Sequence, residues 1–193
     1  MKNLIYAVLL TLIMSQAVVA DDKNDAEKLL KGKLESVIVV LEKKDLDQQL
    51  KKEQICEIIE PVFNFPLMSR LTLGKKHWPS LTQDQKKKFI TLFTKRLKDS
   101  YLDKMLLYSD EKIKYNAPVQ IKKKVHIPTI LVSKDNKINM LYKLYKSKQG
   151  WKIYDIEIQG VSLISTYRSQ FEEILRNKTV EDLLAKLEKP ESN

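Results

Sequence analysis

The chain has 193 residues, of which 43% are hydrophobic and 31% are charged, and its formal net charge is +10. This length suits a single domain with a sizeable core. Cys56 is the only cysteine, which excludes an intrachain disulfide. The two histidines, His77 and His126, stand in no ligand-spaced metal motif. The sequence also lacks a G-x-S-x-G elbow and a P-loop, the patterns of α/β-hydrolases and phosphate-binding NTPases.

Residues 1–20 have the pattern of a secretory signal peptide. Lys2 supplies a short positive segment, Leu4 to Met14 is apolar, and small residues precede a cleavage position after Ala20. The apolar run is short for a membrane-spanning helix, although an uncleaved anchor is the alternative. No cysteine follows it, which argues against a lipoprotein. We therefore predict a signal peptide at residues 1–20 and one exported domain at residues 21–193.

The first half of the exported chain has the periodicity of amphipathic helices. One helical face runs from Ala26 to Leu41, and a second helix is expected from about Leu50 to Phe63. Pro66 and Gly74 bracket a short third helix. Thr82 and Gln85 form a capping box for a fourth. The apolar positions of this fourth helix are Phe89, Ile90, Phe93, Leu97, Tyr101 and Met105.

From about Lys112 the pattern changes to strands joined by short turns. One strand contains Val125 to Val132, with Pro128 predicting a bulge, an edge or a break. A turn at residues 134–137 leads to a strand from Ile138 to Lys146. A further strand runs from Trp151 to Gln159, and alternation places Tyr154, Ile156 and Ile158 on one face. Hairpin-length connections predict a mainly antiparallel sheet.

Gly160 ends the last strand and a helix follows from about Val161. Ile164, Tyr167, Phe171, Ile174 and Leu175 share one face of this helix, and a final helix begins at Thr179. The predicted fold class is therefore α+β. N-terminal helices pack on a mainly antiparallel curved sheet, and C-terminal helices close the domain. Such layers can enclose an apolar cavity, but ordinary filled packing would give the same pattern.

Two motifs in this order resemble a known family. The C-terminal run G-V-S-L-I-S-T-Y-R-S-Q-F follows W-K-I-Y-D, and an earlier segment reads F-N-F-P-L-M-S-R-L-T-L-G-K-K-H-W. Both are similar to signatures of the MlaC, or toluene-tolerance, family, and the resemblance covers nearly all the chain after residue 20. Asn64 departs from the aspartate usual in the family, yet both residue types can cap a helix.

The resemblance implies a periplasmic phospholipid carrier, not an enzyme, with no cofactor. The implied partners are phospholipid, an MCE-type inner-membrane ABC transporter complex and an outer-membrane lipoprotein complex, without nucleic acid and without stable membrane insertion. Two alternatives stay open at this point. One is a secreted module for another hydrophobic small molecule. The other is a secreted hydrolase, for which no nucleophile with a positioned base is found.

The matched segments suggest residues for the site. The predicted lipid-binding wall consists of Phe93, Leu97, Tyr101, Ile156, Ile158, Leu163, Ile164 and Tyr167. Arg70 and Arg168 are expected either to contact the headgroup or to be structural, as in an ion pair of Arg168 with Asp155. The lysine segments 86–88 and 122–124 are expected at the surface. They would serve either solubility or electrostatic steering toward acidic partners or anionic headgroups.

Overall fold

The computed structural model describes residues 2–107, 112–133 and 136–190, and side chains from Asp22 onward. The predicted signal peptide, residues 1–20, therefore falls on positions whose side chains lie outside the described part of the chain. Within the part that is described, no helix combines the length and apolarity needed to cross a membrane.

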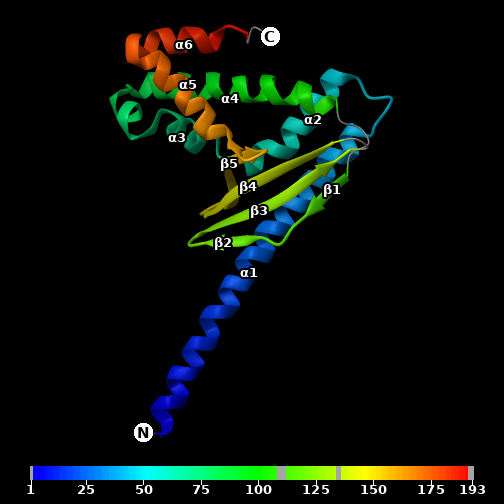
Figure 1. Ribbon diagram of the computed structural model, residues 1–193, viewed down its shortest axis with the longest axis vertical. Helices are drawn as coiled ribbons and strands as arrows, with labels where there is room; N and C mark the ends of the chain where they lie inside the picture. Colours follow the sequence, from blue (N-terminus) through cyan, green and yellow to red (C-terminus); the bar gives the residue numbers. More distant parts are fainter. Residues whose placement is uncertain (1, 108–111, 134–135, 191–193) are drawn as a thin grey trace.

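Helices occupy both ends of the chain and strands its middle (Figure 1). The α-helices are α1 (Lys2–Leu41), α2 (Gln48–Ile59), α3 (Phe65–His77), α4 (Gln83–Leu106), α5 (Leu163–Asn177) and α6 (Val180–Glu188). The strands are β1 (Lys112–Tyr115), β2 (Val119–Ile121), β3 (Lys124–Val132), β4 (Lys137–Ser147), β5 (Gly150–Ile158) and β6 (Val161–Ser162). Two short 3-10 helices, Glu60–Val62 and Trp78–Ser80, flank α3. The predicted α+β class is confirmed.

The sheet is antiparallel in the order β1-β3-β4-β5-β6, with β2 also paired to β3. Pro128 lies within β3, and this strand continues through it. The break lies in the neighbouring edge, where residues 116–118 separate β1 from β2 opposite Pro128. The Asn116 amide donates to the Pro128 carbonyl. Because the N–H and C=O of one strand residue point to the same side, the missing N–H of Pro128 faces that gap. No hydrogen bond to β4 is lost.

A β-bulge in β5 overturns one prediction about its faces. The pairing shifts between Lys143, opposite Asp155, and Leu144, opposite Ile153, so Tyr154 is the extra residue. Ile153 and Ile156 thus lie in one buried cluster, whereas Tyr154 lies near Tyr145 and Lys124 on the other face. The prediction that Tyr154 shares a face with Ile156 and Ile158 is wrong, because simple alternation takes no account of an inserted residue.

Local signals in the sequence set most helix ends. The Asn64 side chain caps α3, and Gly74 interrupts that helix with a φ of +63°, which only glycine adopts readily. Thr82 and Gln85 form the predicted capping box of α4, and Thr179 with Asp182 forms another at α6. These caps determine the residues at which α3, α4 and α6 begin.

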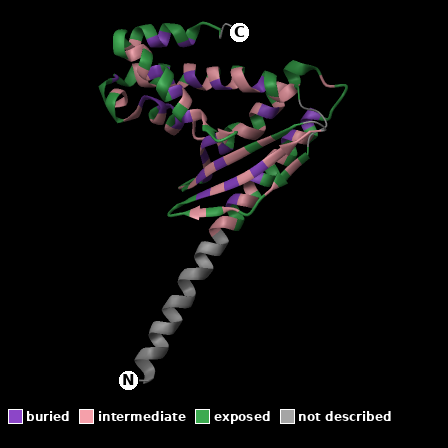
Figure 2. Ribbon diagram, in the orientation of Figure 1, coloured by how far each residue is buried: buried purple, intermediate pink, exposed green. Residues whose placement is uncertain are grey.

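The buried residues, coloured purple in Figure 2, form three clusters. The helical cluster joins α3, α4, α5 and α6. The sheet cluster joins α1 to one face of β3, β4 and β5, including Ala26, Leu30, Ile127 and Leu144. The third joins the end of α1 to α2 and the end of α4, with Cys56 half-buried beside it. Burial raises the pKa of the Cys56 thiol.

Candidate functional site

The eight residues predicted to line a lipid-binding wall are divided between two clusters. Phe93, Leu97, Ile164 and Tyr167 are buried in the helical cluster, and Tyr101 packs against it. Ile156 is buried in the sheet cluster, and Ile158 and Leu163 pack against that one. The two groups approach each other at Phe63, which packs against both clusters, and at Leu163 and Ile164, which are neighbours in sequence. An apolar boundary therefore runs between the sheet and the helical layer.

Aromatic rings fill the centre of the helical cluster. Phe93 is 0% exposed, and its ring centroid lies 5.0 Å from that of Tyr167, 5.7 Å from Phe171 and 5.8 Å from Phe89. Edge-to-face and offset contacts of this kind stabilise beyond the area they bury. Phe93 is thus a packed core residue, and a ligand could reach it only if these rings moved.

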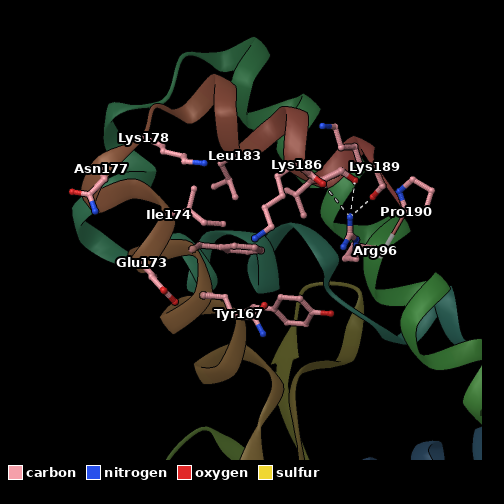
Figure 3. A pocket seen from close by; sticks show the side chains of 13 residues that line it. Arg96, Tyr167, Glu173, Ile174, Asn177, Lys178, Leu183, Lys186, Lys189 and Pro190 are labelled. Atoms are coloured by element: carbon pink, nitrogen blue, oxygen red, sulfur yellow. Dashed lines mark hydrogen bonds between the residues drawn. The ribbon is translucent and has the colours of Figure 1, made fainter. Parts of the chain in front are cut away.

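A pocket of about 730 Å³ lies beside this aromatic group, between α4, α5 and α6 (Figure 3). Its volume falls within the range of small-molecule sites. Tyr167, Phe171, Ile174, Leu183 and Leu187 supply apolar wall. The remaining lining residues are mostly polar and include Arg96, Lys178, Lys186, Lys189 and a single carboxylate, Glu173. Apolar and cationic side chains therefore line the same pocket, a combination that suits an amphiphile that carries negative charge.

Arg96 links the rim of this pocket to the end of α6. Its guanidinium donates to the carbonyls of Lys186, at 3.2 Å, and Leu187, at 3.3 Å, and also to that of Lys189. The last carbonyls of a helix lack partners within the helix, so a cationic donor here both satisfies them and complements the helix dipole. Arg96 therefore holds α6 against α4 and keeps the pocket wall in place.

Sequence reasoning placed only Tyr167 among the residues of this pocket. Phe171 and Ile174 were recognised as part of the apolar face of α5 but not as a site, and Leu183 and Leu187 of α6 also line the pocket. The sequence did not show that α6 packs across α4 and α5. Periodicity identifies an apolar side of a helix but not the element against which that side packs. The available signal was that Lys178, Lys186 and Lys189 lie before, within and after the last helix.

Asp155 connects the sheet to the start of α5. It is 5% exposed, and one carboxylate oxygen lies 3.0 Å from the Lys143 ammonium and accepts from the Ser162 hydroxyl at 2.8 Å. The other oxygen accepts from the Ile164 amide at 3.2 Å. Burial lowers the pKa of Lys143, but hydrogen bonds to Glu157 and Asp155 outweigh it, so the pKa lies above its ordinary value. The Ser162 side chain also caps α5 by accepting from the Ser165 amide.

The two predicted arginines differ in their surroundings. The Arg168 guanidinium donates to the Leu71 carbonyl through Nε at 2.9 Å and Nη2 at 2.5 Å. The ion pair expected between Arg168 and Asp155 is wrong, because Asp155 pairs with Lys143 instead. The bond from Arg168 to Leu71 is nevertheless a structural contact, which joins α5 to α3. Arg70 is exposed and makes no hydrogen bond or ion pair within the described ranges.

Among the residues whose side chains are described, no group of three or more histidine, cysteine, aspartate or glutamate residues could hold an ion. His77 lies 3.0 Å from Glu172, and His126 lies 3.3 Å from the Tyr154 hydroxyl. Burial lowers the pKa of His126, and the nearby Lys143 and Lys124 lower it further.

Comparisons with known proteins agree with this architecture. The family model described as MlaC protein matches residues 31–189. The solved structure of a phospholipid-binding protein from Ralstonia solanacearum, in complex with a phospholipid, superposes with a TM-score of 0.76. The two sequences are 23% identical, and the match covers 84% of this chain and 94% of the other. At that identity, the structural match shows a shared fold.

Proposed function

Because the chain belongs to the MlaC family, we propose that it binds phospholipid and carries it through the periplasm between membranes. The observation that carries this proposal is the family match over residues 31–189. The phospholipid complex of a protein with the same fold supports it. The signal-like residues 1–20 are consistent with export and cleavage before Asp21. The partners we propose are an MCE-type inner-membrane transporter complex and an outer-membrane lipoprotein complex.

Carriage of this kind needs binding and no bond chemistry. The obstacle to moving a phospholipid through water is the exposure of its tails. At about 0.8 kcal/mol per methylene, transfer of an acyl chain of about fifteen carbons from the bilayer to water costs about 12 kcal/mol of free energy. A protein that surrounds the tails with apolar side chains removes most of this cost. We therefore propose no catalytic residue and no cofactor.

The tails would lie along the two apolar clusters and the headgroup at a polar opening. The described pocket supports this arrangement, since its lining combines apolar Ile174 and Leu183 with the cations Lys178, Lys186 and Lys189. Separation of the helical cluster from the sheet cluster would extend the space toward Leu163, Ile156 and Ile158. Our proposed tail contacts remain the eight predicted wall residues, namely Ile156, Ile158 and Leu163 together with Phe93, Leu97, Tyr101, Ile164 and Tyr167.

Two substitutions test where the tails lie. Ile174→Glu places a charge on the wall of the described pocket, and Ile158→Arg places one at the half-buried edge of the sheet cluster. A charge that must be buried against acyl chains is costly, so each should reduce copurifying lipid by at least about tenfold. Native mass spectrometry of protein purified from the periplasm, followed by lipid extraction, measures this. Val39→Arg is the control, because Val39 is 57% exposed.

The outcomes separate the alternatives. A folded Ile158→Arg protein with normal lipid would remove the sheet-side residues from the site, and the same result for Ile174→Glu would remove the pocket. Copurification of a hydrophobic compound other than phospholipid would favour a different binding module. Turnover of an ester substrate by the purified protein would favour a hydrolase.

A further inference from the structure

The positive charge of this chain is concentrated in one segment of its sheet. Residues 112–154, from β1 to the middle of β5, contain eleven lysines, one aspartate and neither arginine nor glutamate, which gives a formal charge of +10. This equals the charge of the entire chain, so the remaining residues, mostly helical, sum to zero. Solvation alone does not require this segregation, because lysines spread over all elements would keep the protein equally soluble.

The register places exposed aliphatic side chains on the same face as some of these lysines. In the β2–β3 ladder Val119 is opposite His126, and Ile121 is opposite Lys124. Cross-strand partners share a face, and this face is opposite to the one on which Val125 and Ile127 pack against α1. Val119 is 51% exposed and Ile121 is 43% exposed. The face therefore combines positive charge with apolar surface open to solvent.

The charge is concentrated further where two hairpins end together. Lys122 and Lys123 form the turn between β2 and β3, and Lys148 lies in the turn between β4 and β5. Because Lys124 pairs with Tyr145 near the end of β4, these two turns lie at the same end of the sheet. In Figure 1 the β2–β3 hairpin lies at the far side of the sheet from α6. We call this group, Val119, Ile121, Lys122, Lys123, Lys124 and Lys148, the hairpin end.

We propose that the hairpin end is a contact surface for anionic phospholipid bilayers. Lysines near an anionic surface each gain attraction from its potential, and exposed aliphatic side chains can enter the interfacial region beside them. The sheet edge formed by β1 and β2 could in principle pair with a strand of another protein, but its structure disfavours this. The edge consists of two short strands separated by residues 116–118, which include Pro118, and such interruptions prevent strand addition. The contact would be weak and reversible, since no helix or acyl anchor contributes to it.

Vesicle binding by the purified full-length domain tests the surface directly. The probes are vesicles of phosphatidylglycerol and phosphatidylcholine in equal parts, against phosphatidylcholine alone. We expect cosedimentation with the anionic vesicles only, and its loss when NaCl rises from about 0.05 M to about 0.5 M. Reversal of three charges, Lys122→Glu, Lys123→Glu and Lys148→Glu, should weaken binding at least about tenfold. Val119→Ser with Ile121→Ser should weaken it less while leaving the salt dependence unchanged.

A matched control separates this surface from net charge. Lys44→Glu, Lys75→Glu and Lys87→Glu change the charge by the same amount on the helical side. These lysines are exposed, and their side chains make no hydrogen bond or ion pair within the described ranges. The control should bind as the parent does, and both triple variants should keep the parent melting temperature. Equal loss in the two variants would overturn the proposal, as would absence of anionic binding. If reversal at the hairpin end slowed lipid transfer to the transporter complex without affecting vesicle binding, the surface would be a protein contact instead. None of these results depends on which cavity holds the lipid.

Discussion

At the scale of single residues, Arg168 compensates for the interruption of α3. Gly74 breaks the helix, so carbonyls in the preceding turn lose regular partners, and Arg168 donates to that of Leu71. We expect Arg168→Ala to lower the free energy of unfolding by about 1–2 kcal/mol, with lipid bound or removed. Denaturant unfolding measures this. The control is Arg176→Ala, an exposed position on the same helix, which should have little effect. If Arg168→Ala lost lipid but kept its stability, Arg168 would be assigned to the headgroup instead.

At the scale of elements, one carboxylate joins β4, β5 and α5. Asp155→Ala would leave the Ser162 hydroxyl and the Ile164 amide without this acceptor and the Lys143 ammonium with Glu157 only. We expect a loss of about 3 kcal/mol, because an uncompensated group would be left in a buried site. Urea unfolding followed by circular dichroism measures it. Glu157→Ala removes the other carboxylate near Lys143 without touching α5 and should cost less; equal losses would show that Asp155 acts through Lys143 alone.

At the scale of the whole molecule, the helical and sheet clusters meet along a limited boundary at Phe63, Leu163 and Ile164. A ligand that binds only the folded protein raises its stability by mass action. We therefore expect extraction of the lipid to lower the melting temperature by several degrees, and added phospholipid to restore it. Differential scanning calorimetry of loaded and extracted protein provides the measurement. An unchanged melting temperature after complete extraction would contradict a lipid held between the clusters.

Much of the fold follows from local sequence signals. Thr82 with Gln85, Thr179 and Gly74 set helix ends through groups a few residues away, so their effects do not depend on distant parts of the chain. The alternation of β3 and the apolar face of α5 were likewise predictable from their periods. Tyr154 was misplaced because a bulge depends on how two strands pair, and pairing is not a property of one strand.

The sequence by itself determined the α+β class, the family, and the confinement of net positive charge to residues 112–154. Each of these is a property of residue order or of short-range periodicity. Only the tertiary structure decided that the predicted wall residues divide between two clusters, and that α6 closes a pocket against α4 and α5 with Arg96 at its rim. It also decided that Val119 and Ile121 share a face with Lys124. The reason is that an apolar or charged face acquires its neighbours through long-range packing and strand register, which residues distant in sequence set together.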